Sequence, residues 1–199
     1  MPNFEIETYY QNEGYAIVCG VDEAGRGPLS GPVFAAAVVL PNDLVLEGLN
    51  DSKKLSPKKR EALFDLICEK AITYGIASAS VEEIDEMNIL EASLLAMRRA
   101  IAMLSPAADF ALIDGNCEKE FTLPVKAVVK GDAKSCSIAA ASILAKVSRD
   151  RLCEEHDKQY PVYGFAKHKG YGTKAHMDAI RQHGPCPIHR KSFLGFLDK

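Results

Sequence analysis

The chain has 199 residues, which is long enough to bury a sizeable core in one large domain or two small ones. An apolar share of 47% and a charged share of 26% are typical of a soluble globular protein. No apolar run approaches the roughly 20 residues that span a bilayer, and the acidic N-terminus does not resemble a secretory signal. Composition therefore excludes a membrane-spanning protein and predicts a cytoplasmic one.

Charge is unevenly distributed along the sequence. The net charge of −3 argues against indiscriminate binding of nucleic acid. Residues 51–60 nevertheless hold five basic groups and one acid, and residues 158–177 hold four lysines and no acid. Residues 81–91, by contrast, hold five acids and no base. This segregation fits a basic face that meets a polyanion, and it equally fits a set of solvated faces, so both interpretations stay open.

Apolar runs and helix signals alternate through the first part of the chain. Residues 15–21 and 33–40 predict two buried strands, joined by a loop rich in glycine and proline. Ser56-Pro57 marks the start of a helix, because proline suits the first helical position. Residues 71–80 predict a third strand.

A long amphipathic helix is predicted next. It starts at a capping box formed by Ser80 and Glu83, and apolar residues then recur every three or four positions as far as Leu104. Two further apolar runs, residues 109–114 and 124–129, complete a predicted sheet of five strands.

The last third of the sequence is predicted to be helical. An alanine-rich helix covers about residues 135–155, and Thr173 caps another helix that ends at Gly184. The alternation of strands and helices predicts one α/β domain. We expect a sheet-containing core at about residues 15–132 and a helical C-terminal part at about residues 133–199.

Carboxylates stand at the ends of three predicted strands. Asp22 and Glu23 end the first strand, Asp114 ends the fourth, and Asp132 follows the fifth. Acids brought together from separate strands repel each other by several kcal/mol unless a cation neutralises them, and hard divalent cations prefer oxygen ligands. The same residues could instead be ordinary turn residues or helix caps.

Two divalent ions about 4 Å apart can hold the attacking and leaving oxygens of a phosphodiester displacement, with water as the nucleophile. No serine, cysteine or histidine nucleophile is then required. Neighbouring residues on a strand point to opposite faces, so Asp22 and Glu23 reach the same ions only if the strand breaks between them. We therefore expect Asp22 to be the surer ligand of the two.

Other catalytic and metal-binding patterns fit the sequence less well. The chain contains no P-loop, no dinucleotide-binding glycine motif and no GxSxG elbow. Its cysteines are not closely paired, so a disulfide framework is not expected. One group of residues invites a zinc hypothesis: Cys153, His156, His183, Cys186 and His189. Their spacing is not that of a standard zinc finger, so we favour loop residues without a metal role.

Six motifs in a fixed order identify a family resemblance. They are GVDEAGRGPLSGPV, DSKKLSPKKRE, LIDGN, VVKGDAKSCSIAAASILAKVSRD, HKGYGTKAH and HRKSF. Together they closely resemble the bacterial ribonuclease HII family, the type 2 ribonucleases H, over about residues 16–193. Because a chain of this length leaves no room for the additional N-terminal substrate-binding domain of the related ribonuclease HIII, we expect the shorter enzyme.

The resemblance implies a ribonuclease-H-like fold: a mixed five-stranded sheet with flanking helices and a C-terminal helical extension. It implies an endonuclease that uses Mg²⁺ or Mn²⁺ to cut the RNA strand of RNA–DNA hybrids. Such an enzyme also cuts on the 5′ side of ribonucleotides embedded in duplex DNA, leaving a 3′-hydroxyl and a 5′-phosphate. The implied residues are the catalytic metal ligands Asp22, Glu23, Asp114 and Asp132, the Gly-Arg-Gly element Gly25, Arg26 and Gly27, and the substrate-reading Tyr171.

Elementary chemistry agrees with these implied roles. Glycines at 25 and 27 let the backbone approach a sugar closely, and only contact with the 2′-hydroxyl separates RNA from DNA. Arg26 can engage a phosphate bidentately. Tyr171 can stack against the sugar or base next to the ribonucleotide, or it can be a turn aromatic that packs on the last helix.

Lysines supply candidate phosphate contacts, which position a duplex and make affinity fall with salt. The candidates are Lys53, Lys54, Lys167 and Lys169. Each could equally be a solvated surface group. Lys146, on the alanine-rich helix, either faces the site or extends its charged end to solvent.

The expected partners are RNA–DNA hybrids and duplex DNA that contains ribonucleotides. A non-catalytic binding module of the same fold is the alternative, and it predicts a missing carboxylate or a broken Gly-Arg-Gly element; the sequence shows neither. The tail KSFLGFLDK lacks the glutamine that usually begins a clamp-binding peptide, so we expect it to pack against the body. A monomer is the default.

Overall fold

The computed structural model describes residues 1–49, 52 and 55–197. Its centre is one five-stranded sheet with the strand order β3-β2-β1-β4-β5. The strands are β1 (Val18–Ala24), β2 (Val33–Val39), β3 (Thr73–Ala79), β4 (Phe110–Asp114) and β5 (Val125–Val128). The pairs β1–β2 and β2–β3 are antiparallel, whereas β1–β4 and β4–β5 are parallel. The predicted mixed five-stranded sheet is confirmed.

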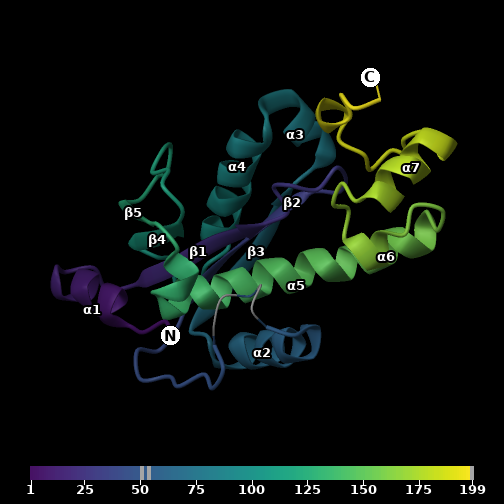
Figure 1. Cartoon of the computed structure of the whole chain (residues 1–199). Coiled ribbons are helices and arrows are strands. Elements are labelled where there is room, and N and C mark those ends of the chain that lie inside the picture. Colours follow the sequence, from purple (N-terminus) through teal and green to yellow (C-terminus); the bar gives the residue numbers. More distant parts are fainter. Residues whose placement is uncertain (50–51, 53–54, 198–199) are drawn as a thin grey trace.

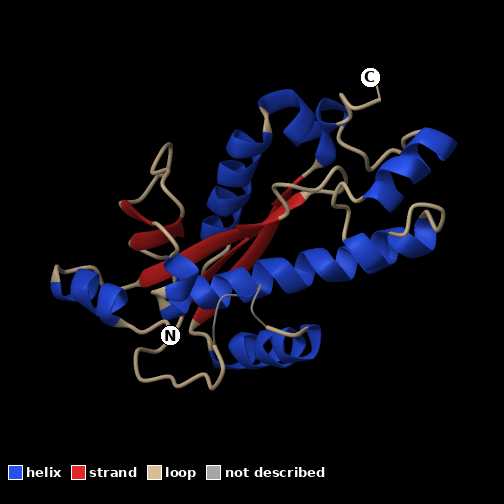
Figure 2. Ribbon diagram, in the orientation of Figure 1, coloured by secondary structure: helices blue, strands red, loops and turns tan. Residues whose placement is uncertain are grey.

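Helices cover both faces of this sheet (Figures 1 and 2). They are α1 (Glu5–Asn12), α2 (Pro57–Lys70), α3 (Val81–Met87), α4 (Ile89–Ala102), α5 (Cys136–Gln159), α6 (Phe165–His168) and α7 (Lys174–His183). Two single turns of 3₁₀ helix, η2 (Gly131–Ala133) and η3 (Lys191–Phe193), complete the described elements. No helix in this described part is long and apolar enough to cross a bilayer.

Strand β2 shows how the two faces are divided. Ala35, Ala37 and Val39 pack with the buried side chains of α4, whereas Ala36 and Val38 pack with those of α5. This alternation follows from the two-residue period of a strand. Because both faces are buried, β2 is apolar throughout, as the continuous run VFAAAVV indicates.

The alanine-rich helix α5 lies unusually close to β1. A Cβ atom built on Gly20 would lie 2.2 Å from the backbone nitrogen of Ile138 and 2.2 Å from the backbone carbon of Ser137. Ala139, Ala140 and Ala141 are fully buried in the same helix. The small residues therefore let the backbones of strand and helix approach each other, and this approach fixes α5 beside the end of β1.

Two predicted boundaries are wrong. The first strand does not end at Val21 but continues to Ala24. The single long helix predicted to run to Leu104 is two helices, because Asn88 adopts a φ of 78° between α3 and α4. The side chain of Asn88 accepts hydrogen bonds from the backbone N–H groups of Leu90 and Glu91 and so starts a new helix. The apolar periodicity continues across this break because α3 and α4 pack on the same sheet face.

Helix α1 was not predicted from the sequence. Its Glu7 is buried, and a carboxylate oxygen accepts hydrogen bonds from the hydroxyl of Ser135 (2.7 Å) and the backbone N–H of Ser137 (3.0 Å). A carboxylate at a helix N-terminus is favourable, since the unpaired N–H groups there carry partial positive charge. Helix α1 therefore holds the start of α5, while the capping box of Ser80 and Glu83 is confirmed at α3.

Candidate active site

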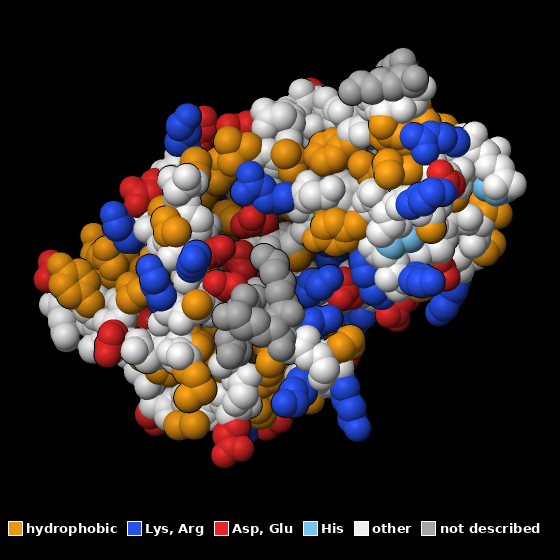
Figure 3. Space-filling view, viewed as in Figure 1, with side chains coloured by type: hydrophobic (Ala, Val, Ile, Leu, Met, Phe, Trp, Pro, Cys, Tyr) orange, Lys and Arg blue, Asp and Glu red, His pale blue; other side chains and the backbone are white. Residues whose placement is uncertain are grey.

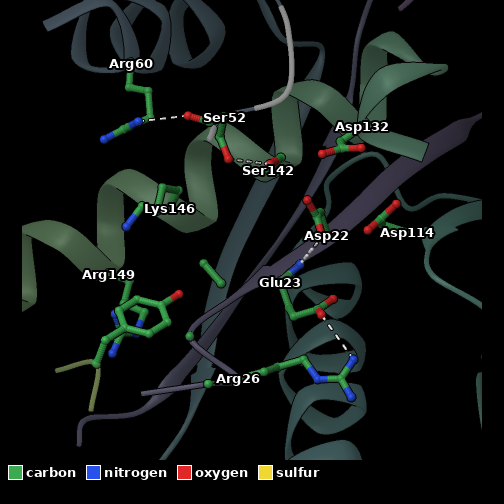
Figure 4. Close-up of a pocket in the computed structure, with 14 residues that line it drawn as sticks. Asp22, Glu23, Arg26, Ser52, Arg60, Asp114, Asp132, Ser142, Lys146 and Arg149 are labelled. Carbon is green, nitrogen blue, oxygen red and sulfur yellow. Dashed lines mark hydrogen bonds and ion pairs between the residues drawn. The ribbon is translucent and has the colours of Figure 1, made fainter. Parts of the chain in front are cut away.

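One cavity of about 510 Å³ contains all four predicted carboxylates. It opens beside the ends of β1 and β4, and a cavity of this size lies in the usual range for ligand sites. Figure 4 shows the residues that line it: Asp22, Glu23, Ala24, Gly25, Arg26, Gly27, Ser52, Arg60, Asp114, Asp132, Ser142, Lys146, Arg149 and Tyr171. The fold therefore brings together residues that lie as far apart in sequence as 22 and 171.

Asp22 is the most deeply placed of the four acids, with 6% of its surface exposed. Its carboxylate accepts a hydrogen bond of 2.7 Å from the backbone N–H of Glu23, and Ser142 lines the same cavity. Burial raises the pKa of Asp22 well above its usual value, and the charges of Glu23 and Asp114 raise it further. A negative charge at this position is therefore unfavourable until a cation compensates it.

Glu23 lies beside Asp22 without any break in the strand. Both residues remain paired with β2, while the pairing of β1 with β4 stops at Val21. The strand therefore does not break between the two acids, and both line the cavity; that they reach the same ions stays a prediction. Burial raises the pKa of Glu23, and the nearby Arg26 guanidinium, at 3.4 Å, opposes that rise.

Asp114 and Asp132 lie near Asp22, on the same side of the cavity (Figure 4). One oxygen of Asp114 accepts a hydrogen bond of 2.6 Å from the backbone N–H of Gly131, which links the end of β4 to the turn η2 that carries Asp132. A Cβ atom on Gly131 would lie 2.6 Å from Ile138 and 3.2 Å from the Asp114 oxygen. Glycine is therefore needed where this turn approaches Asp114.

The donor set fits a hard divalent cation. The described lining of the cavity contains carboxylates and hydroxyls but neither histidine nor cysteine, and Mg²⁺ and Mn²⁺ prefer such oxygen ligands. In the described residues no group of three or more His, Cys, Asp or Glu side chains is already drawn together as a metal site. The roles of the four acids as ligands of such a cation stay a prediction.

The opposite wall of the cavity is basic. Ser142, Lys146 and Arg149 of α5 line it, and their spacing of four and three residues places them on one face of the helix. The ammonium group of Lys146 lies 2.6 Å from one carboxylate oxygen of Asp150. The other oxygen of Asp150 lies 3.8 Å from the guanidinium of Arg60. Figure 3 shows acidic side chains beside lysine and arginine side chains in the hollow of this face. The sequence interpretation missed Ser142, Arg60 and Arg149, although the spacing along the alanine-rich helix was a usable signal.

Ser52 joins three parts of this wall. Its hydroxyl lies 2.8 Å from the hydroxyl of Ser142, and its carbonyl accepts a hydrogen bond of 2.8 Å from Arg60. These hydrogen bonds connect α2 with α5 beside the cavity that Asp22 lines.

The loop between β1 and β2, residues 25–32, is here named the Gly-Arg-Gly loop. Gly25 has a φ of +104°, a conformation that suits glycine. A Cβ atom on Gly27 would lie 3.4 Å from the ring of Tyr171, which is 46% exposed. The backbone N–H of Leu29 donates a hydrogen bond of 2.8 Å to the carbonyl of Gly170. The structure therefore places the tyrosine directly against the predicted Gly-Arg-Gly element.

The predicted lysine contacts are less closely tied to the cavity. Lys53 and Lys54 lie outside the described residues. Lys167 is exposed, whereas the ammonium group of Lys169 forms an ion pair of 3.0 Å with Glu154. Neither Lys167 nor Lys169 lines the cavity, so any contact they make with a duplex lies beyond its rim.

Behind Tyr171 lies a group of buried imidazoles. The Nε2 atoms of His176 and His189 are 3.0 Å apart, and Nδ1 of His176 lies 2.9 Å from the carbonyl oxygen of Tyr171. His168 stacks on His176 with 4.3 Å between ring centroids. The sulfur atom of Cys186 lies 3.1 Å from Nδ1 of His189. These contacts hold the backbone at Tyr171 in place. Among the described residues, no group of three or more His, Cys, Asp or Glu side chains could hold a metal ion, so the structure adds no support to the zinc hypothesis.

The stability of the fold should fall in mild acid because of His176. Burial lowers the pKa of His176 from 6.5 to about 4, so the unfolded chain binds a proton between these pH values and the folded chain does not. The contribution of His176 to the free energy of unfolding is therefore complete above pH 6.5. It is lost, by up to about 1.4 kcal/mol per pH unit, as the pH falls towards 4. Denaturant unfolding at pH 7, 5.5 and 4.5 measures this slope.

His176→Gln should flatten that pH dependence, whereas His183→Gln, at an exposed position, should leave it unchanged. Equal slopes in the wild type and His176→Gln would contradict the assignment. The comparison of slopes is needed because carboxylates also contribute to acid unfolding in all three proteins.

A mixed sheet that delivers carboxylates from the ends of β1 and β4 to an oxygen-lined cavity defines the class of the protein, a metal-dependent nuclease of the ribonuclease-H-like fold. Within that class, the chain belongs to the ribonuclease HII family, whose model, described as Ribonuclease HII, matches residues 19–195. The family resemblance inferred from the six motifs is therefore confirmed. Its members are metal-dependent endoribonucleases.

Individual relatives agree with this assignment. The chain is 56% identical over 191 residues to the ribonuclease HII of Caldicellulosiruptor saccharolyticus, covering 96% of this chain and 93% of that protein. The crystal structure of ribonuclease H2 from Pyrococcus horikoshii OT3 superposes with a TM-score of 0.73 at 30% identity, over 89% of this chain and 94% of that one. The ribonuclease HII of Archaeoglobus fulgidus, solved in complex with PCNA, gives a TM-score of 0.76 at 27% identity, over 89% and 95%.

Proposed function

We propose that the chain hydrolyses the RNA strand of RNA–DNA hybrids and cuts on the 5′ side of ribonucleotides embedded in duplex DNA. The products carry a 3′-hydroxyl and a 5′-phosphate. The observation that carries this proposal is the shared cavity, in which four carboxylates, the Gly-Arg-Gly element and Tyr171 lie together. The four carboxylates account only for the hydrolysis of a phosphodiester. The adjacent Gly-Arg-Gly element is what can distinguish a ribose from a deoxyribose.

The four acids divide into distinct roles in this proposal. Asp22, the most buried, would hold the divalent cations together with Asp114 and Asp132, and Glu23 would assist. Two Mg²⁺ or Mn²⁺ ions, when bound, supply Lewis-acid activation of the attacking water and stabilisation of the leaving oxygen. The hydrogen bond from the backbone N–H of Glu23 holds the Asp22 carboxylate in place for this task.

Substrate selection belongs to the opposite side of the cavity. A ribose can bring its 2′-hydroxyl into contact with the backbone of Gly25 and Gly27, because neither residue has a side chain that would intervene. Arg26 is half exposed and can reach a phosphate. The partly exposed ring of Tyr171 lies against Gly27 and is available to stack on the neighbouring nucleotide.

A cleavage assay tests the proposal. The purified protein is incubated with a DNA duplex that carries one ribonucleotide, with Mg²⁺ or Mn²⁺ and separately with EDTA, beside an identical all-DNA duplex. We expect a metal-dependent cut 5′ to the ribonucleotide and none in plain DNA. Binding without cleavage in either metal would reject the enzyme and leave the non-catalytic hybrid-binding module.

We expect the loss of the Tyr171 ring to affect cleavage of the two substrates differently. Tyr171→Ala should lower cleavage of the single-ribonucleotide duplex by about tenfold, since one lost stacking contact is worth about 1–3 kcal/mol. Cleavage of a long RNA–DNA hybrid should fall less, because several registers are available on it. Tyr9→Ala serves as the control, since Tyr9 is exposed on α1 and does not line the cavity. Equal losses on both substrates would contradict a role in reading the junction.

Partner binding beyond the nucleic acid is not part of this proposal. The C-terminal tail packs on the body, as predicted: Leu194 is buried with Ile180, and the Arg181 guanidinium lies 5.4 Å from the ring centroid of Phe196. Leu194 is therefore covered, whereas Leu197 is exposed. We do not extend the PCNA complex of the archaeal relative to this chain, and we keep the monomer as the working state.

A further inference from the structure

Arg190 is a fully buried arginine in the motif HRKSF, and its partners are unusual for a buried charge. In the described structure it forms no ion pair with a carboxylate; its guanidinium donates only to backbone carbonyls of residues 25–31. The acceptors are Gly25 (2.6 Å), Arg26 (3.0 Å), Pro28 (2.8 Å) and Gly31 (2.8 Å). The backbone N–H of Arg190 also donates to the carbonyl of Leu29, at 2.9 Å.

These hydrogen bonds fix the direction of two peptide groups. In a trans peptide the C=O and the following N–H point in opposite directions. The carbonyls of Gly25 and Arg26 point towards the buried guanidinium, so the N–H groups of Arg26 and Gly27 point away from it. Neither N–H group has a hydrogen-bond partner among the described residues, and both residues line the cavity.

A second buried guanidinium completes the support. Arg149 donates to the carbonyls of Lys169 (2.9 Å) and Ser30 (3.2 Å), and a Cβ atom on Gly25 would lie 2.2 Å from its Nε. Burial, followed by the charge of Arg149, lowers the pKa of Arg190 to about 9, so Arg190 still carries its charge at neutral pH. Two cations therefore lie under the loop with no carboxylate partner in the part of the chain that the structure describes, and there they also favour an anionic ligand.

We propose that Arg190 is the positioning residue that turns the Arg26 and Gly27 N–H groups into the cavity, and thereby sets the preference for ribose over deoxyribose. The inference rests on the proposed function, since it assigns the reading of the 2′-hydroxyl to these two amides. Arg190 acts through the loop and does not itself touch the substrate, being fully buried behind it.

Arg190→Lys tests the proposal, because lysine keeps the charge but cannot reach four carbonyls in a fixed plane. We expect kcat/KM for the single-ribonucleotide duplex to fall by about tenfold, the effect of two weakened hydrogen bonds. The inhibition constant of an identical all-DNA duplex, measured as a competitor, should change by less than about twofold, because that duplex has no 2′-hydroxyl to read. Arg181→Lys is the matched control, since Arg181 is half exposed and pairs with Asp178.

The outcomes separate the inference from the function on which it rests. If the wild type does not cut the ribonucleotide duplex, the proposed function fails. If the wild type cuts it but Arg190→Lys weakens both duplexes equally, the positioning role is wrong and Arg190 is a general brace. If Arg190→Lys weakens neither, the positioning role is wrong as well.

A measurement on the wild type covers the case in which the variant does not fold. In EDTA, where no cleavage is expected, the ¹⁵N–¹H signals of Arg26 and Gly27 should shift further with the ribonucleotide duplex than with the all-DNA duplex, which has no 2′-hydroxyl. Identical responses to the two duplexes would overturn the proposal.

Discussion

Asp22→Asn is expected to abolish cleavage of the single-ribonucleotide duplex, with a loss of at least about 1000-fold in kcat. The substitution keeps the shape of the side chain but removes the charge at the most buried acid of the cavity. Lewis-acid stabilisation by a bound cation is worth several kcal/mol in the transition state, and each 1.4 kcal/mol is tenfold in rate. Single-turnover cleavage in Mg²⁺ and in Mn²⁺ measures the loss.

The same substitution should stabilise the cation-free protein. A carboxyl group whose folded pKa is raised binds protons more tightly when folded, so its charge opposes folding above about pH 4. Asparagine removes that cost at pH 7, and the melting temperature in EDTA should therefore rise. Divalent cations should raise the melting temperature of the wild type by mass action and that of Asp22→Asn much less.

Asp43→Asn is the matched control for both measurements, because Asp43 is exposed and remote from the cavity. It should cut normally and respond to cations like the wild type. Normal cleavage by Asp22→Asn, or an equal thermal response to Mn²⁺ in both proteins, would contradict the role given to Asp22.

Gly20→Ala is expected to destabilise the fold by about 3 kcal/mol or more, at the upper end of the range for overpacked cores. The added methyl group would lie 2.2 Å from backbone atoms of both Ser137 and Ile138, and neither can rotate away as a side chain could. The only relief is to move α5 off β1, which would also displace Ser142 from Asp22. A loss of this size lowers the melting temperature by about 10 °C in a chain of this length.

Gly195→Ala provides the contrast, since no atom lies within 4 Å of its added Cβ. It should unfold at the wild-type denaturant concentration. If Gly20→Ala were as stable as Gly195→Ala, the close contact between β1 and α5 would be wrong, and the placement of α5 beside the carboxylates would need revision.

The periodic signals in the sequence predicted most of the fold. The five strands were found because apolar runs such as VFAAAVV are bounded by glycine, proline and charge, and the capping box at Ser80 gave the start of α3. The break at Asn88 was missed because the apolar pattern continues through it. Helix α1 was missed because its main partner, the start of α5, lies more than 120 residues away in sequence.

The acidic part of the site was the easiest to predict, because strand ends and the six motifs pointed to the same four residues. The basic wall was harder, since Arg60 and Arg149 gain a meaning only when α2 and α5 are placed beside β1. The role proposed for Arg190 could not be read from sequence at all, because it depends on carbonyl directions in a loop about 160 residues distant.

The central claim is that this cavity holds divalent cations between the carboxylates of β1, β4 and η2. An anomalous-difference map from crystals grown in Mn²⁺ tests it most directly, because the metal is located without any assumption about activity. We predict a peak in contact with Asp22, shared with Asp114 or Asp132, and absent from crystals of Asp22→Asn. A map whose strongest peak lies at the histidine group behind Tyr171, or one with no peak at the carboxylates, would contradict the claim.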